Sequence, residues 1–277
     1  NITAPGPMHG STSCNQAGDC DEIWSYPMFK DLENAAPNSF VGIAAHRLFG
    51  TSLSFDGQAS TGEGLLVSGG YFDILGLQPA MGRLIQPMDA ETVGEPYIAV
   101  LSHGYWEREL GSDPAVLNKT LVINGHTMTV VGVAPRGFRG TTLGANPDVF
   151  VPITMRAQMQ PGWDQFDNRR GYWAYLFGRL QPGVEVEQAR AELNGIHSGI
   201  IQEVEADLNS HMSEQTMARF LAKEIILSPG YRGQSSMHEE AKTPLNLLFA
   251  VTGSPRTEEE KESIIIYPVR APGNPIN

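Results

Sequence analysis

The densest structural pattern in this sequence is Leu101-Ser-His-Gly-Tyr-Trp-Glu-Arg-Glu-Leu110, followed by Gly111-Ser-Asp-Pro114, Ile123-Asn-Gly-His126 and Val130-Val-Gly-Val-Ala-Pro135. It predicts a helix, a turn and a β-hairpin with no spare loop between them. Ser102 is suited to cap the helix over 104–110, because a serine side chain accepts a hydrogen bond from a free backbone N–H. Asn124-Gly125 between β-branched runs predicts a type I′ turn, which needs positive φ at both central residues.

Outward from this pattern, the sequence predicts further regular elements. Helices are expected over 26–36, 71–75 and 184–208, the first capped by Ser25 and the last carrying Val186, Ala189, Leu193, Ile196, Ile200 and Val204 on one face. Strands are expected over 41–55, 63–68, 96–101, 149–153, 172–180 and 224–227. Residues 1–22 and 155–171 are expected to be loop. Strands and helices in this order, with many hairpins, predict an α+β fold and not a doubly wound parallel sheet.

Composition limits the classes of function. The chain has 277 residues, 41% of them hydrophobic, and a formal net charge of −12. Its length suits one large or two modest domains, and its acidity disfavours binding to nucleic acid or to anionic lipid. The longest apolar run, Leu245–Val251, is too short to cross a membrane. No signal peptide is visible after Asn1, so we expect a fragment or a mature product.

The two cysteines, Cys14 and Cys20, lie close together in a polar stretch. We expect them to form a disulfide in an oxidising compartment, because exposed free thiols tend to be avoided. Two free thiols in a cytosolic protein is the alternative that the sequence leaves open.

A search for catalytic and metal-binding motifs gives none, so the sequence predicts no catalytic, cofactor-binding or metal residue. The seven histidines lack zinc-site spacing, and the G-x-S-x-G, Walker A and G-x-G-x-x-G patterns are absent. Glu203 and Glu205 are interpreted as solvated carboxylates. The alternatives are a hydrolase built from dispersed Ser68, His103 and Asp148, or a sensor module that uses 172–177 as a pocket wall. Because both faces of 172–177 are apolar, we interpret it as core.

The local clusters of positive charge are candidates for contact with an acidic partner. They consist of Arg136, Arg139, Arg169 and Arg170. As isolated charges at the rim of an interface they would add little affinity.

Several strings, in order along residues 25–250, resemble the extracytoplasmic core domain of MacB-like permeases of ABC transporters, within the broader FtsX-like group. They are Ser25-Tyr-Pro-Met-Phe-Lys-Asp-Leu32, Leu66-Val-Ser-Gly-Gly-Tyr-Phe-Asp-Ile-Leu-Gly76, Ala99-Val-Leu-Ser-His-Gly-Tyr-Trp106, Val130-Val-Gly-Val-Ala-Pro135 and Gly178-Arg-Leu-Gln-Pro-Gly183. The resemblance implies a porter-like βαβ-type subdomain formed by residues 1–90 and 170–253. It also implies a smaller inserted α/β (sabre-like) subdomain over 91–169, and it leaves the role of 254–277 uncertain.

The resemblance also implies a function without catalysis. Such a domain stands outside the inner membrane, in the periplasm, and couples ATP-driven conformational change to the handling of cargo or an adaptor protein. ATP binds to a separate nucleotide-binding domain or subunit, so no cofactor is expected here, and the whole protein is expected in the membrane, with a homodimer among its assemblies. The alternative is a stand-alone extracytoplasmic ligand-binding or sensor module, and a secreted hydrolase ranks below it.

Overall fold

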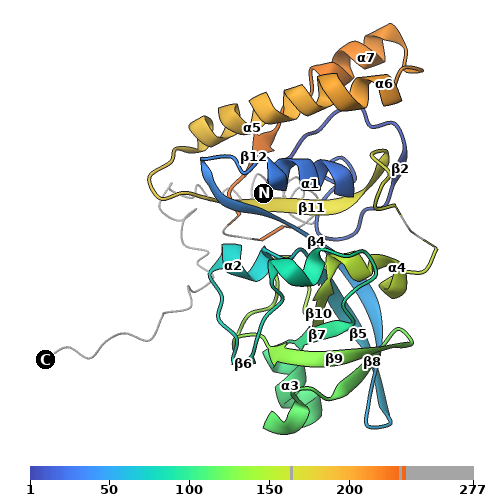
Figure 1. The fold of residues 1–277 in the computed structure, drawn as a ribbon, viewed down its shortest axis with the longest axis vertical. Coiled ribbons are helices and arrows are strands. Elements are labelled where there is room, and N and C mark those ends of the chain that lie inside the picture. Colours follow the sequence, from blue (N-terminus) through green and yellow to red (C-terminus); the bar gives the residue numbers. More distant parts are fainter. Residues whose placement is uncertain (163–164, 231–232, 235–277) are drawn as a thin grey trace, which may run out of the picture. The chain divides into compact units, whose positions relative to one another are not determined.

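The computed structural model describes residues 1–162, 165–230 and 233–234, which form a mixed sheet covered by helices (Figure 1). The strands, in their order across the sheet, are β12 (Ile226–Leu227), β1 (Ile2–Thr3), β11 (Gly171–Leu180), β4 (Phe40–Phe55), β5 (Gln58–Val67), β10 (Val149–Pro152), β7 (Ile98–Leu101), β9 (His126–Val133) and β6 (Met81–Gly82). Off this path, β2 (Ser11–Thr12) and β3 (Trp24–Ser25) pair with β11, and β8 (Thr120–Ile123) pairs with β4 and β9. The predicted mixed α and β architecture is confirmed.

The helices fall into groups along this sheet. The α-helices are α1 (Tyr26–Asn34), α2 (Tyr71–Leu75), α3 (His103–Leu110), α4 (Arg156–Met159), α5 (Val186–Ile200), α6 (Ala206–Leu208) and α7 (Glu214–Leu221). The 3-10 segments are η1 (Pro87–Ala90), η2 (Pro114–Val116) and η3 (Ile153–Met155), and η4 (Ile201–Glu205) is a π-helical segment between α5 and α6. Figure 1 shows α5, α6 and α7 on the side of α1 and β11, while α3 lies near β7 and β9.

Strand β4 is paired on both of its edges. It pairs with β5 from His46 to Phe55 on one edge. On the other edge its beginning pairs with β11, from Phe40 to His46, and its end pairs with β8 at Leu53 and Ser54. Strands β5 and β11 and strand β8 of the middle segment therefore meet on β4.

The predicted local signals are found at their positions. The Ser25 hydroxyl accepts a hydrogen bond from Met28 N at 3.2 Å, and the Ser102 hydroxyl accepts one from Tyr105 N at 3.1 Å. Asn124 and Gly125 have φ of 49° and 83°, as a type I′ turn requires. The helix caps and the 120–133 hairpin are thus confirmed.

Two segments predicted as loop carry regular structure. Ile2 pairs with Leu176 of β11 and with Leu227 of β12, and its side chain is buried. Because this pairing joins residues that are far apart in the sequence, no local sequence pattern predicts it. Arg156–Met159 forms the short helix α4, where the sequence predicts loop.

The predicted division into 1–90 plus 170–253 and 91–169 stays a prediction. The sheet passes between the two predicted subdomains without interruption, through the pairing of β4 with β8 and of β5 with β10. The segment at 245–253 and the tail at 254–277 lie outside the described residues.

The buried position of Ile2 gives a stability test. We expect Ile2→Ala to lower the free energy of unfolding by about 3 kcal/mol, because it removes a core side chain and leaves a cavity. Ile226 of the neighbouring strand is 47% exposed, so Ile226→Ala is the matched control and should cost less than about 0.5 kcal/mol. Urea unfolding of both variants measures the difference, and equal losses would show that β1 is not part of the core.

Candidate functional site

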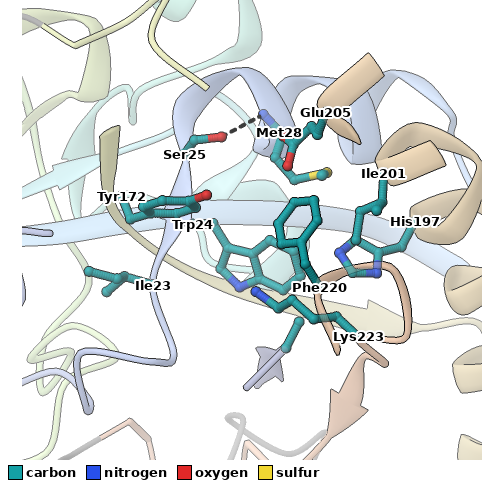
Figure 2. Close-up of a pocket in the computed structure, with 11 residues that line it drawn as sticks. Ile23, Trp24, Ser25, Met28, Tyr172, His197, Ile201, Glu205, Phe220 and Lys223 are labelled. Atoms are coloured by element: carbon teal, nitrogen blue, oxygen red, sulfur yellow. Dashed lines mark hydrogen bonds between the residues drawn. The ribbon is translucent and has the colours of Figure 1, made fainter. Parts of the chain in front are cut away.

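A small cavity lies between the helical segment after β11 and the strands β3 and β11 (Figure 2). Its volume is about 20 Å³, which suits a single water molecule. Five of the lining residues that Figure 2 labels have polar side chains: Ser25, Tyr172, His197, Glu205 and Lys223. Polar side chains gathered inside a small cavity are unusual, because burial penalises each charged form.

The π-helical segment places this cavity's acidic group. Helix α5 buries Ala189, Leu193 and His197 at regular helical spacing. Over Ile201–Glu205 the helix widens, and an added residue in a turn shifts the side chains that follow around the axis. Ile201 and Glu205 are therefore buried, while Val204 is 41% exposed.

Two sequence interpretations are corrected here. The buried face predicted for 184–208 was expected to include Val186 and Val204, which are 48% and 41% exposed. Glu205 was interpreted as a solvated carboxylate. Glu205 is 4% exposed instead. The widened turn is the physical reason at Val204 and Glu205. It turns Glu205 toward the buried face of the helix and Val204 toward the exposed face. Helical periodicity alone gives no sign of a π segment.

Burial raises the pKa of Glu205 to about 7. Arg169 Nη1 lies 3.6 Å from Glu205 Oε1, and Arg169 Nη2 lies 2.7 Å from Asp31 Oδ2 of α1. The positive charges of Arg169 and Lys223 lower this pKa but do not outweigh the loss of solvation. Glu205 therefore exchanges its proton close to neutral pH, between α1 and the helical segment.

The bases that line the same cavity are also displaced from their ordinary behaviour. Burial lowers the pKa of His197 to about 4, and its ring meets Trp24 edge-on, with the ring centroids 5.5 Å apart. Burial also lowers the pKa of Lys223, while Glu205 and Asp21 raise it. We refer to Asp31, Arg169, His197, Glu205 and Lys223 as the Glu205 cluster. Its members are linked by the ion pairs of Arg169 and by the effects of their charges on one another's pKa.

The structure separates the four candidate arginines into exposed and internal ones. Arg136 and Arg139 are exposed in the loop between β9 and β10, and Arg136 lies 3.7 Å from Glu107 of α3. Arg169 belongs to the Glu205 cluster and is 21% exposed. Arg170 Nη1 lies 3.2 Å from His211 Nε2. Contact of these arginines with a partner stays a prediction, and for Arg169 its internal ion pairs compete with it.

Cys14 and Cys20 form a disulfide, with their Cα atoms 5.1 Å apart. The loop that it closes is held against β11, because the Tyr175 hydroxyl accepts a hydrogen bond from Asn15 N at 2.9 Å. The same hydroxyl lies 3.0 Å from the carbonyl oxygen of Gly18.

The residues of the alternative hydrolase have other partners. The Ser68 hydroxyl accepts a hydrogen bond from Ala45 N, His103 lies 3.7 Å from Glu107, and Asp148 pairs with Arg108 at 3.1 Å. In the strand at 172–177, Trp173 and Tyr175 are fully buried, while Tyr172 lines the small cavity. Within the described residues, no cluster of three or more metal-ligating side chains is present, and no helix is long and apolar enough to span a membrane.

Comparison with known proteins gives a family and several solved structures of similar fold. Residues 6–196 match the family described as the MacB-like periplasmic core domain. The periplasmic region of MacB from Actinobacillus actinomycetemcomitans is similar in fold, with a TM-score of 0.54 at 12% identity over 88% of this chain and 91% of that chain. A domain of a permease protein from Porphyromonas gingivalis has a TM-score of 0.50 at 22% identity, over 82% and 86% of the two chains. The curated proteins include no match.

The raised pKa of Glu205 predicts a pH-dependent difference in stability. A carboxyl with a folded-state pKa of about 7 and an ordinary value of 4.5 favours folding below pH 4.5, and this contribution is lost as pH rises through 7. Gln does not titrate, so Glu205→Gln should gain stability relative to the wild type by on the order of 2 kcal/mol between pH 4.5 and 8. The opposite titration of His197 is common to both proteins and cancels in the comparison.

Urea unfolding at several pH values measures this difference. Glu203 lies in the same π segment with its side chain exposed, so Glu203→Gln is the matched control and should follow the wild type at every pH. Parallel stability curves for Glu205→Gln and the wild type would contradict the assignment.

Proposed function

Because the chain belongs to the family of MacB-like periplasmic core domains, we propose that it relays ATP-driven conformational change of an ABC transporter permease to a cargo or an adaptor protein. In this proposal the domain breaks no covalent bond and carries no cofactor. ATP is hydrolysed by a separate domain or subunit, and membrane helices connect the two. The membrane is the cell inner membrane, and a homodimer is the assembly that we propose for the complete protein.

The double pairing of β4 is the observation that carries the proposal. At its beginning β4 pairs with β11, and at its end it pairs with β8 of the middle segment. In this proposal a displacement of β11 is transmitted to residues 91–169 along the hydrogen-bonded β4–β5 ribbon. Two-stranded ribbons twist more readily than wide sheets, so this part of the sheet suits a change in orientation.

Between these two pairings, side chains replace strands on one edge of β4. Asn124 Oδ1 accepts a hydrogen bond from Ser52 N at 2.7 Å, and its Nδ2 donates to Gly50 O at 3.0 Å and to Met159 O at 2.8 Å. Asn15 Nδ2 donates to Leu48 O at 3.1 Å. We propose that β4 between Arg47 and Ser52 is the joint of the relay, held by side-chain contacts that reform more easily than a strand ladder.

A distance measurement in the complete transporter tests the relay. Spin labels on cysteines introduced at Glu107 of α3 and Glu187 of α5 report on the two predicted subdomains, since both side chains are exposed. We expect the distribution of distances between the two spin labels, measured by double electron–electron resonance, to shift between the nucleotide-free and the ATP-bound state. Asn124→Gly keeps the turn but removes the hydrogen bonds of the Asn124 side chain to β4. We expect this variant to broaden the distribution.

Two controls accompany this measurement. Labels at Glu107 and Glu91 both lie within 91–169 and should keep a constant distance. Asp56 also has a positive φ in a two-residue turn, but its side chain does not hold the open edge of β4. Asp56→Gly should therefore leave the distribution sharp. An unchanged Glu107–Glu187 distance in both nucleotide states would refute the relay.

A further inference from the structure

A groove lies between the tip of the β4–β5 hairpin and helix α3, with a volume of about 470 Å³. One wall is formed by β5 at Gln58, Ala59 and Ser60, and the other by α3 at Glu109 and Leu110, with η2 at one end. The groove is separate from the lining of the Glu205 cluster. It is wide enough for a peptide segment and not for a folded domain.

The β5 wall presents backbone groups without a neighbouring strand. Asp56 and Gly57 have φ of 46° and 80° and form a two-residue turn, so Phe55 and Gln58 beside it exchange hydrogen bonds. By alternation, Ala59 and Thr61 direct their N–H and C=O groups away from β4.

The next residue in this alternation confirms the direction. The Glu63 carbonyl points away from β4 and accepts a hydrogen bond from Asp148 N at 2.7 Å. Strand β10 pairs with β5 only from Gly64 onward. Among the described strands, none pairs with the outer edge of β5 over 58–62, and such an edge accepts an added strand.

The groove is acidic. Three carboxylates, those of Asp56, Glu109 and Asp113, line it, and no lysine or arginine is among its described lining residues, although Arg108 Nε beside it lies 2.6 Å from Glu109 Oε1. At one end the chain's own Lys119 shows how a cation fits there. Its Nζ lies 3.7 Å from Asp113 Oδ2 and 5.8 Å from the centre of the Phe55 ring. A cation beside a carboxylate and an aromatic ring gains both electrostatic attraction and cation–π attraction.

We propose that this groove binds an extended basic segment of a partner protein, which pairs with β5 at Ala59 and Thr61 and directs lysine or arginine side chains to Asp56, Glu109 and Asp113. Backbone hydrogen bonds would supply affinity, and the carboxylates would select a cationic sequence. The inference deepens the proposed function, because it gives the chemistry of a partner for the domain. Its test uses no ATP turnover and no domain movement, so its failure would leave the relay untouched.

Titration of the chain with a labelled synthetic peptide of alternating lysine and valine tests the inference by fluorescence anisotropy. We expect saturable binding that weakens as salt rises, because screening reduces attraction between exposed charges. The triple variant Asp56→Asn, Glu109→Gln, Asp113→Asn should bind about tenfold or more weakly. Each amide keeps an oxygen acceptor, and Asn-Gly suits the turn at 56–57, so we expect the fold to persist, as circular dichroism will check.

Three controls separate the outcomes. Glu91→Gln removes an exposed carboxylate outside the groove and should leave binding unchanged. A peptide with glutamate in place of lysine should not bind, and one methylated on alternate backbone nitrogens should lose most of its affinity. No binding of the lysine peptide, or equal binding by the folded triple variant, would overturn the proposed site. Equal binding of the methylated peptide would overturn the pairing with β5.

Discussion

The double pairing of β4 is the constraint on which the described part of the molecule depends. Buried backbone groups must find partners, and β4 finds them in β5 on one edge and in β11 and β8 on the other. Between β11 and β8 that edge is closed by side chains, since Asn15 Nδ2 donates to Leu48 O and the Asn124 side chain bonds Gly50 O and Ser52 N. Arg47 donates hydrogen bonds to the Trp173 carbonyl oxygen at 2.9 Å and to the Ser13 hydroxyl at 2.7 Å. Burial lowers its pKa to about 10, so the guanidinium keeps its charge at neutral pH.

The Glu205 cluster depends on a second feature, which is the π-helical turn in the segment after β11. The π turn at Ile201–Glu205 allows the segment to bury both Ile201 and Glu205. Burying a carboxylate costs free energy, and ion pairs of Arg169 with Asp31 and Glu205 offset part of that cost. The result is a link between α1 and the helices whose charge changes near neutral pH.

The sequence predicts those parts of the fold that are determined by neighbouring residues. The Asn124-Gly125 turn, the Ser25 and Ser102 caps and the apolar strand at β11 each follow from local chemistry and are confirmed. The pairing of Ile2 with Leu176 and the burial of Glu205 were not predictable in this way. The first joins residues that are far apart in the sequence, and the second depends on a widened turn that helical periodicity does not reveal. The edge of β5 likewise emerges only when β10 is seen to begin beside Gly64.

The net charge of the chain favours a cationic partner over an anionic one. The chain carries 31 acidic and 19 basic side chains. Several basic ones are withdrawn from the surface: Arg47 and Arg156 are buried, and the Arg156 guanidinium lies over the Trp173 ring, 4.0 Å from its centre. A buried cation attracts internal groups and cannot touch a partner. Among the described residues two acidic side chains, Asp89 and Glu205, are buried as well, so burial leaves the excess of acidic over basic groups at the surface unchanged. Arg136 and Arg139 are exposed on a surface where carboxylates are in excess, and this excess favours positive charge in whatever approaches it.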